Sequence, residues 1–312
     1  MLGFLAEWSV DAVRELLAPV IDLRDDPLVL DEWVGSHPQW AAGGALIGSR
    51  YVAKFACSAV TAERIDREAR VLNVLRGRIT APELVVASTD PVFFVTRLVP
   101  GEPLSRELLA TGDVDEVGAQ LAAYLADLHR PEILATVTDE LGAAPGFPVP
   151  GPQATTDQLR TDLPGFLPER QVGQVRDWCD WADEVLAAPA EPVLVHGDFH
   201  GHNQIWDDRL RLRLVADLET CGAAEPEYDL RYLPAFGAGV PLLTATAEHY
   251  SRATGRPLRL DRAMAWHLLS FLGDSLWRSQ AGLPLLLPVP GGGTPADYVD
   301  VVRRRFDALG MS

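Results

Sequence analysis

The sequence predicts an α+β protein of two unequal lobes, a small N-terminal lobe built on antiparallel strands and a larger, mostly helical C-terminal lobe. Three observations lead to this prediction. Strand-like segments gather before residue 99, amphipathic helical stripes dominate after it, and the Pro- and Gly-containing sequence VPGEP at residues 99–103 forms a natural hinge. We therefore expect residues 1–99 and residues 100–312 to form the two lobes.

The N-terminal lobe is predicted from short apolar segments and amphipathic helical patterns. The expected elements are, in order, a helix over residues 9–18 capped by Ser9, a strand over 28–34, two strands within 45–55 separated by a bend at Gly48, a helix over 62–76 and a strand over 91–98. The helix over residues 9–18 is expected to pack on this lobe.

The C-terminal lobe is predicted from apolar residues that recur every three or four positions. The expected helices cover residues 113–129, 171–187 and 262–279, and a last one begins at Thr294-Pro295. Asp113 and Glu116 have the spacing of a capping box, which supports the first of these helices.

A polar loop at residues 196–203, HGDFHGHN, carries the most chemically informative residues. It follows the apolar run at 193–195, and Asp217 stands at the end of the next predicted strand. Asp198, Asn203 and Asp217 can therefore converge. Phosphoryl transfer needs such a set, because one carboxylate accepts the proton of the attacking hydroxyl while an amide and a second carboxylate hold magnesium.

The polar loop together with the later segment ADLE resembles the catalytic and metal-binding loops of the aminoglycoside phosphotransferase family, small-molecule kinases with a protein-kinase-like fold. This resemblance implies that ATP binds between the lobes, that Asp198 is the catalytic base, and that Asn203 and Asp217 bind Mg²⁺. His196 would be a structural member of the loop. Glu219 would touch the metal or support the strand. The sequence does not distinguish ATP from GTP.

Lys54 stands out because it is the only lysine among the 27 basic residues. A compact ammonium kept within the apolar segment YVAKF suits a phosphate contact. Glu68 falls three residues after Ile65 on the inward stripe of the helix over 62–76, and a buried carboxylate needs a partner. We expect Glu68 to pair with Lys54, as the resemblance also implies; Glu63 is the alternative partner.

Further positions follow from the resemblance alone. Ser36 lies in a loop of small residues that does not match GxGxxG, and it is a candidate phosphate contact. The carbonyl of Thr96 and the amide of Leu98 are the expected partners of adenine. Residues 225–230 resemble the family's GDPxYDLA segment without its Gly-Asp, and Asp229 is expected to cap the next helix and to anchor the metal loop.

The acceptor is expected to be a small, hydroxylated and cationic molecule. Residues 131–190 contain ten acidic and three basic side chains, which could form an acidic wall, although an ordinary solvated surface explains them as well. Asp274 and His200 are candidate acceptor contacts. An antibiotic such as an aminoglycoside, modified so as to give resistance, is the first hypothesis.

Other functions remain open. The second hypothesis is a metabolic small-molecule kinase acting on choline, homoserine, a sugar or a ketosamine. The third is a nucleotide-binding module without catalysis. GDFHG also resembles part of a metallophosphoesterase motif in which His200 and His202 would bind metal, but the other histidines form no matching group. A protein kinase is disfavoured because Asp217 is followed by Leu-Glu without glycine.

Composition sets limits on the partners. The chain has 312 residues and a formal net charge of -17 at pH 7, which disfavours a nucleic-acid surface. No apolar run approaches the roughly 18 residues of a membrane span, and no basic-then-apolar leader opens the chain, so a cytoplasmic protein is expected. Cys57, Cys179 and Cys221 are sparse and far apart in sequence, which favours reduced thiols.

Overall fold

The computed structural model describes most of the chain. The described residues are 3–5, 7–31, 42–110, 112–142, 154–188, 190–287 and 293–311. The chain forms two compact units. The first, called here the sheet unit, comprises Met1–Pro103, Arg130–Ala144 and Asn203–Cys221, and the second, the helical unit, comprises Leu104–His129, Pro145–His202 and Gly222–Ser312. The expected division into residues 1–99 and 100–312 stays a prediction.

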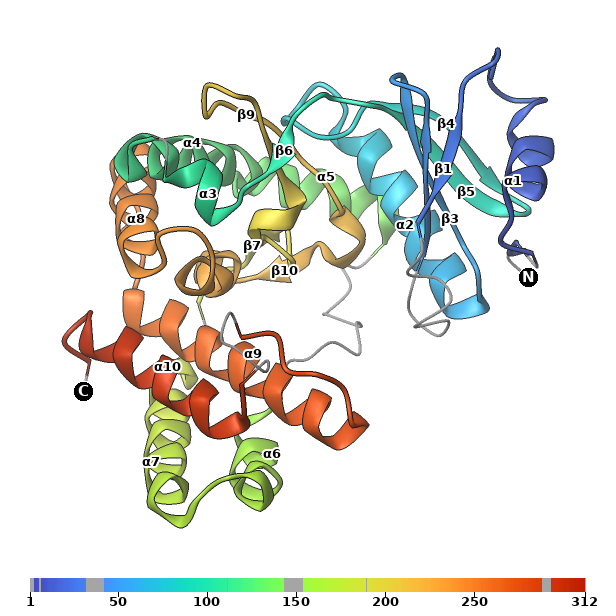
Figure 1. Ribbon diagram of the computed structural model, residues 1–312. Helices are drawn as coiled ribbons and strands as arrows, with labels where there is room; N and C mark the ends of the chain where they lie inside the picture. Colours follow the sequence, from blue (N-terminus) through green and yellow to red (C-terminus); the bar gives the residue numbers. More distant parts are fainter. Residues whose placement is uncertain are drawn as a thin grey trace. The chain divides into compact units, whose positions relative to one another are not determined.

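A five-stranded antiparallel sheet lies at the centre of the sheet unit (Figure 1). Its strands are β1 (Leu28–Leu30), β2 (Gly43–Ile47), β3 (Tyr51–Phe55), β4 (Leu84–Thr89) and β5 (Val92–Arg97), in the spatial order β1-β2-β3-β5-β4. Each of the predicted strand segments contains a strand. Strand β4 was not predicted, because it is an edge strand whose residues alternate between half-buried and exposed and it therefore has no fully buried apolar position.

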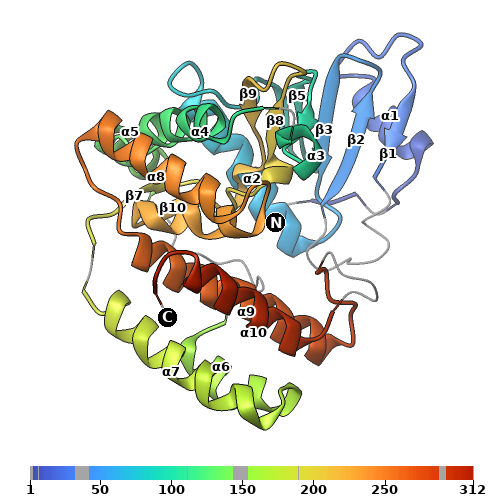
Figure 2. The same ribbon diagram turned by 60° about the vertical axis from the view of Figure 1, so that its left-hand side comes forward.

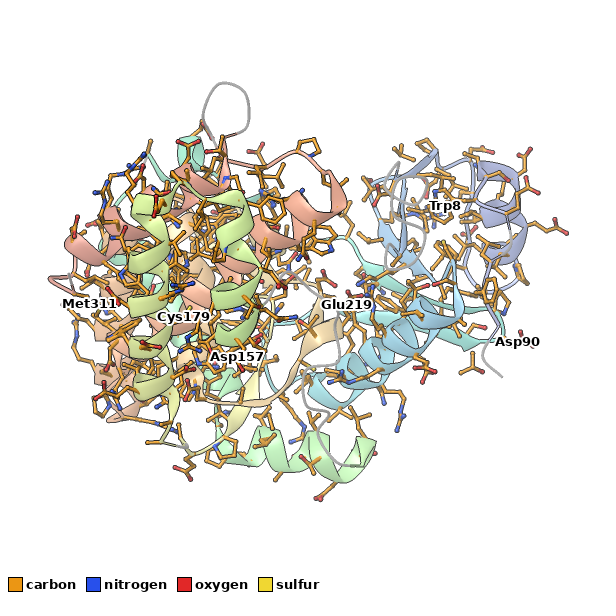
Figure 3. All side chains as sticks on the ribbon, turned by 90° about the horizontal axis from the view of Figure 1, so that it is seen from below. Trp8, Asp90, Asp157, Cys179, Glu219 and Met311 are labelled. Atoms are coloured by element: carbon orange, nitrogen blue, oxygen red, sulfur yellow. The ribbon has the colours of Figure 1, made fainter. Side chains whose placement is uncertain are left out.

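Alternation of side chains along β3 separates its apolar residues from its charge. Ala53 and Phe55 are fully buried on one face of the sheet, in a core shared with helix α1 (Val10–Leu17). The indole of Trp8, labelled in Figure 3, meets the ring of Phe55 edge to face with the centroids 5.7 Å apart. Because successive side chains of a strand point to opposite faces, Lys54 is directed away from this core.

Helix α2 (Ala59–Leu75) begins at a capping box. The Ser58 hydroxyl accepts the N–H of Thr61 at 3.2 Å, and the Thr61 hydroxyl accepts the N–H of Ser58 at 3.0 Å. The helix therefore starts three residues before the predicted range of 62–76. It packs against β4 and β5, and Glu68 lies on its buried face, as predicted.

A second, three-stranded sheet completes the sheet unit. Its strands are β6 (Glu102–Pro103), β8 (Gln204–Trp206) and β9 (Leu212–Val215), followed by the 3-10 helix η4 (Leu218–Thr220), while α5 (Pro131–Leu141) packs on α2. The Asp207 carboxylate closes the turn between β8 and β9 by accepting the N–H groups of Arg209 and Arg211, both at 3.0 Å.

The helical unit contains helices and one two-stranded ribbon. These elements are α3 (Arg106–Leu109), α4 (Val114–Leu128), α6 (Thr156–Thr161), η2 (Leu163–Phe166), α7 (Glu169–Leu186), β7 (Val193–Val195), β10 (Gly222–Ala224), η5 (Pro226–Ala235), α8 (Val240–Thr254), α9 (Leu260–Ala281) and α10 (Pro295–Asp307). The four predicted helices are confirmed. The ends given for the first three differ by one or two residues, and the last begins at Pro295 after the Thr294 cap, as predicted.

The helices of the helical unit pack in pairs, and its ribbon leads into the polar loop. Helix α4 lies beside α8, and α10 lies beside α9, as Figures 1 and 2 show. Strand β7 pairs with β10, with Val195 opposite Gly222, and then leads directly into the loop at His196. Among the described residues, no helix is both long enough and apolar enough to cross a membrane.

Candidate active site

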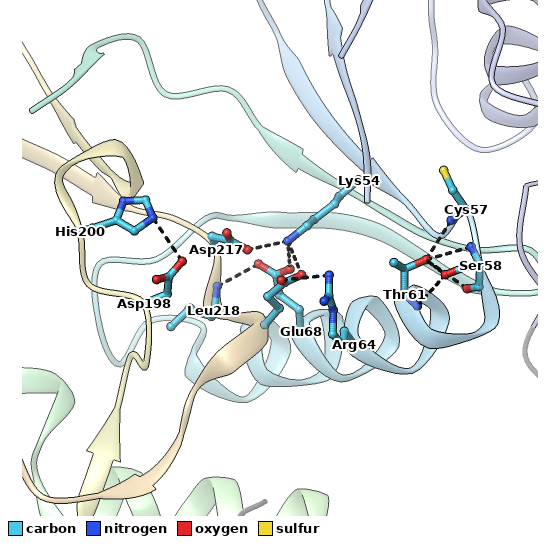
Figure 4. Close-up of polar contacts among 11 residues, drawn as sticks. Lys54, Cys57, Ser58, Thr61, Arg64, Glu68, Asp198, His200, Asp217 and Leu218 are labelled. Atoms are coloured by element: carbon cyan, nitrogen blue, oxygen red, sulfur yellow. Dashed lines mark hydrogen bonds and ion pairs between the residues drawn. The ribbon is translucent and has the colours of Figure 1, made fainter. Parts of the chain in front are cut away.

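Lys54 lies at the centre of a charged network in the sheet unit (Figure 4). Its Nζ atom donates to Glu68 Oε2 at 2.7 Å, to Asp217 Oδ1 at 2.6 Å and to Glu219 Oε2 at 3.0 Å. The expected ion pair with Glu68 is therefore present. Burial disfavours the charge of Lys54, but the three carboxylates outweigh burial and raise the pKa of the ammonium well above its usual value. Lys54 is thus charged at neutral pH.

Glu68 joins Lys54 to the backbone that follows Asp217. One carboxylate oxygen accepts from Lys54, and the other, Oε1, accepts the N–H of Leu218 at 3.0 Å. Burial raises the pKa of Glu68 to about 7, with a contribution from the charges of Asp217 and Glu219 and against the opposing pull of Lys54. Helix α2 thus holds both the lysine and the turn after Asp217 through one side chain, and the sequence analysis predicted only the first of these contacts.

The two predicted metal ligands lie at adjoining ends of the hairpin formed by β8 and β9. Asn203 directly precedes β8, and its carbonyl accepts the N–H of Ala216 at 2.8 Å. Asp217 is the next residue and adopts the left-handed backbone conformation, with φ 68° and ψ 60°. This conformation is uncommon for a residue other than glycine and marks a sharp change of chain direction. The structure therefore brings Asn203 and Asp217 together, while their metal-binding role stays a prediction.

Oxygen donors suited to a hard cation surround Lys54. Glu68, Asp217 and Glu219 each offer a carboxylate oxygen, and these atoms lie within 4.8 Å of one another. Arg64 contributes a second cation, with its Nη2 atom 3.2 Å from Glu219 Oε1. Carboxylate oxygens are the ligands that Mg²⁺ prefers, so the chemistry of the donor set fits this ion.

Glu219 and Arg64 show what sequence reasoning left open and what it missed. Glu219 was expected either to touch the metal or to support the strand, and in the structure it contacts two cations, Lys54 and Arg64. Arg64 was not singled out. A signal was available, because Arg64 precedes Glu68 by four residues and therefore shares its helix face.

In the helical unit, buried Asp229 anchors the polar loop. Its carboxylate accepts the N–H of His196 at 2.8 Å and the N–H of Gly197 at 2.9 Å, and His129 Nε2 lies 3.1 Å from it. Asp229 lies inside η5 and not at its start, so the predicted helix-capping role is wrong. The loop that Asp229 anchors is the one that carries Asp198 and not the predicted metal loop, because the two N–H groups belong to His196 and Gly197.

Asp198, the predicted catalytic base, is half-buried and faces His200 (Figure 4). The distance from His200 Nε2 to Asp198 Oδ2 is 3.2 Å. Burial disfavours the charge of Asp198, but the hydrogen bond from His200 and the nearby positive charge of Arg231 outweigh burial and lower the pKa of Asp198 to about 2. The carboxylate is therefore ionised at neutral pH, as a proton acceptor must be.

Arg231 is a buried cation that the sequence analysis did not identify. Its guanidinium lies over the rings of Tyr228 and Tyr232, 3.8 Å and 4.1 Å from their centroids. It donates to the carbonyls of Gly197 and Tyr228 and to the hydroxyl of Ser270. Little in the sequence indicates that this arginine is buried, because two of its partners, Gly197 and Ser270, are 34 and 39 positions away.

The predicted nucleotide contacts that do not belong to the Lys54 network are Ser36, Thr96 and Leu98. Ser36 lies outside the described residues. Thr96 lies in β5 between β3 and β4. The N–H of Leu98 donates to the carbonyl of Arg50 at 2.9 Å, so an adenine contact at this amide would have to replace that bond. The roles of Ser36, Thr96 and Leu98 stay predictions.

Asp274, a predicted acceptor contact, lies on α9 in the helical unit. Its carboxylate accepts two hydrogen bonds from Arg278 Nε, at 2.9 and 3.1 Å, and one from the Tyr298 hydroxyl at 3.4 Å. Burial raises the pKa of Asp274 despite the opposing effect of Arg278. A cationic acceptor would therefore compete with Arg278 for this carboxylate, and the contact stays a prediction.

Comparison with known proteins places these features in a family context. A family model described as the phosphotransferase enzyme family matches residues 36–267. Viomycin phosphotransferase of Streptomyces vinaceus is 32% identical over 205 residues, which cover 59% of this chain and 67% of that protein.

Solved structures are also similar to this chain in fold. The GDP complex of aminoglycoside 2'-phosphotransferase-IIIa has a TM-score of 0.70 at 14% identity, and the match covers 97% of this chain and 100% of that chain. The streptomycin-ATP ternary complex of APH(2")-IIa has a TM-score of 0.60 at 17% identity, over 88% of this chain and 90% of that one. These likenesses show the fold and confirm the fold class that the sequence predicts.

Proposed function

The chain belongs to the phosphotransferase enzyme family, and from this premise we propose that it transfers the γ-phosphoryl group of a nucleoside triphosphate to a hydroxyl of a small, cationic antibiotic. Its relative in Streptomyces vinaceus is a viomycin phosphotransferase, and two similar structures are a streptomycin-ATP complex of APH(2")-IIa and a GDP complex of aminoglycoside 2'-phosphotransferase-IIIa. ATP is the proposed donor, and GTP is the alternative to be tested beside it.

One observation carries the proposal. Lys54, the only lysine of the chain, contacts Glu68 at 2.7 Å and Asp217 at 2.6 Å. The lysine, the helix carboxylate and the metal-loop carboxylate are three of the parts that phosphoryl transfer in kinase-like folds requires. An ordinary surface ion pair would need neither the burial of Glu68 nor the bond from Glu68 to the backbone of Leu218.

Each of these residues has a role in the proposed reaction. Lys54 binds phosphate oxygens, Glu68 orients Lys54, and Asn203 and Asp217 hold Mg²⁺. When bound, Mg²⁺ neutralises charge on the phosphate oxygens. Asp198 accepts the proton of the acceptor hydroxyl, the hydroxyl oxygen bonds to the γ-phosphorus, and the nucleoside diphosphate leaves with the electron pair of the broken phosphorus–oxygen bond.

The acidic surface supports a cationic acceptor. The net charge of the chain is -17, and α6 and α7 expose the carboxylates of Asp157, Asp180 and Asp183 around the single guanidinium of Arg160. Three carboxylates around one cation leave a negative surface that attracts positively charged molecules. Viomycin and the aminoglycosides are therefore the first acceptors to test.

The test is a panel of acceptors with ATP and with GTP, in which the phosphorylated product is identified by mass spectrometry and ³¹P NMR. We expect transfer to one or more cationic antibiotics, and a host that expresses the protein should gain resistance to the same compounds. The Asp198→Asn variant should give neither. Transfer only to choline, homoserine, a sugar or a ketosamine would instead identify a metabolic kinase, and tight nucleotide binding without any transfer would identify a non-catalytic module.

A further inference from the structure

The two histidines on either side of Asp198 are oriented in the same way. His196 Nδ1 accepts the N–H of Asp198, and His200 Nδ1 accepts the N–H of His202, each at 3.2 Å. The ring of His200 also stacks on Phe236, with the centroids 5.5 Å apart and the planes at 12°. A backbone contact and a ring contact therefore hold the imidazole of His200 in one orientation.

The contact at Nδ1 decides which nitrogen of His200 carries the proton. A ring nitrogen that accepts a hydrogen bond from a backbone N–H has no proton of its own, so the neutral ring is protonated at Nε2. This Nε2 atom lies 3.2 Å from Asp198 Oδ2. His200 therefore donates to Asp198, and the distance is at the long end of the range for such bonds, as is common before substrates bind.

We propose that His200 is a positioning residue for the phosphoryl transfer: its Nε2–H bond to Oδ2 orients Asp198 so that the other oxygen, Oδ1, receives the proton of the acceptor hydroxyl. This inference rests on the proposed function. His200 itself neither gains nor loses a proton in the step, because the hydroxyl proton passes to Oδ1 while the hydroxyl oxygen bonds to the γ-phosphorus. The structure thus assigns His200 to Asp198, whereas the sequence suggested an acceptor contact.

Other groups also influence the carboxylate. The charged or titratable groups that face Asp198 are His196, His200 and His202 from the loop itself and Tyr228, Arg231 and Tyr232 from η5. The hydrogen bond from His200 is the largest of the effects that lower the pKa of Asp198. Removal of this donor should therefore change both the orientation of Asp198 and the pH at which it loses its charge.

Two substitutions separate the hydrogen bond from the ring contact. His200→Phe keeps an aromatic ring against Phe236 and removes the donor, whereas His200→Gln offers an amide donor at a similar reach. His249→Phe is the matched control, because His249 lies in the same unit, is equally exposed and contacts the carboxylate of Asp115 at 2.9 Å. Thermal unfolding of all three variants checks that they are folded.

We expect His200→Phe to lower kcat by about ten- to a hundred-fold with little change in KM for either substrate, since the loss is one of orientation in the transition state. The acid limb of its pH profile should move to higher pH, because the donor that lowers the pKa of Asp198 is absent. His200→Gln should recover most of kcat, and His249→Phe should match the wild type.

Several outcomes would overturn the inference. These are a wild-type kcat in His200→Phe, equal losses in the Phe and Gln variants, or an equal loss in the His249 control. The ring nitrogens can also be observed directly by ¹⁵N NMR, which needs no turnover. An Nδ1–H tautomer in an active enzyme would overturn the inference alone, whereas an Nε2–H tautomer in a protein that phosphorylates no acceptor would overturn the proposed function and, with it, the role of His200 in transfer.

Discussion

The network around Lys54 and the loop around Asp198 both place carboxylates beside basic groups, but their charge balance is opposite. In the sheet unit, the Lys54 ammonium bonds to three carboxylates, and burial raises the pKa of Glu68 to about 7. In the helical unit, the single carboxylate of Asp198 faces the donor of His200 and the charge of Arg231, and its pKa falls to about 2.

This difference separates two tasks. A site with surplus carboxylates attracts cations and suits the binding of a metal beside the phosphates that Lys54 is proposed to bind. A carboxylate stabilised by donors stays ionised over the whole physiological pH range and is ready to accept a proton. The experiments below test this contrast, in order of decreasing effect.

Asp198→Asn tests the second task. The amide cannot accept the proton, so kcat should fall by about a thousandfold, the middle of the range for loss of a general base. Nucleotide affinity, measured by isothermal titration calorimetry, should stay the same because the Lys54 network is unchanged. Asp115→Asn, which alters another aspartate that contacts a histidine, should leave kcat unchanged. A wild-type kcat for Asp198→Asn would disprove the role of this residue.

Lys54→Met tests the first task. It leaves the Glu68 carboxylate buried without this cation, which should lower the free energy of unfolding by about 3–5 kcal/mol at pH 8. The loss should be smaller at pH 6. Burial raises the pKa of Glu68 to about 7, so at pH 6 its carboxyl group is mostly protonated and uncharged in the folded protein and needs no cation beside it.

The double variant Lys54→Met/Glu68→Gln should regain most of this stability, measured by urea denaturation, because the buried charge is removed with its partner. It should not regain nucleotide affinity, since the ammonium is still missing. A single Lys54→Met variant as stable as the wild type at pH 8 would mean that solvent, and not Lys54, satisfies the Glu68 carboxylate.

The pH dependence of stability tests the role of His267, which contacts the backbone of Arg231. His267 Nδ1 contacts the Arg231 carbonyl at 2.7 Å, and Nε2 contacts Arg305 at 2.9 Å. Burial, with the charge of Arg305, lowers the pKa of His267 well below its usual value. Below pH 6.5 the unfolded chain therefore binds a proton that the folded protein does not, and stability falls with acidification by up to about 1.4 kcal/mol per pH unit.

His267→Asn retains an amide donor for the carbonyl and removes the titrating ring. The stability of this variant, measured by urea denaturation between pH 7 and pH 5, should fall less steeply than that of the wild type. Parallel slopes for the two proteins would show that His267 is protonated in the folded state as readily as in the unfolded one.

Ser58→Ala should have the smallest effect. It removes the side chain that accepts the N–H of Thr61 at the start of α2, and such caps contribute about 1 kcal/mol. Thermal unfolding should report this loss, while kcat should change little because Glu68 lies more than two turns into the helix. A large drop in kcat would show that the start of α2 controls the position of Glu68.

The amino-acid sequence was sufficient to predict the fold class, most of the strands and helices, and the residue types of the candidate site. Local patterns were sufficient for these features. The helix periodicity of α2 placed Glu68 on the buried face, the single lysine identified Lys54, and the spacing of Asp198, Asn203 and Asp217 matched a family motif. Local signals were too weak for β4, an edge strand without a fully buried position.

The partners of these residues, in contrast, depend on how the chain packs in three dimensions. Glu68 bonds to the N–H of Leu218, Glu219 joins Lys54 to Arg64, and Asp229 anchors the polar loop although the sequence suggested a helix cap. These contacts join residues 32 to 165 positions apart. Side-chain periodicity reports which face of an element is buried, but the charge that a buried group meets depends on how distant segments pack, and this packing also sets the opposite pKa shifts of Glu68 and Asp198.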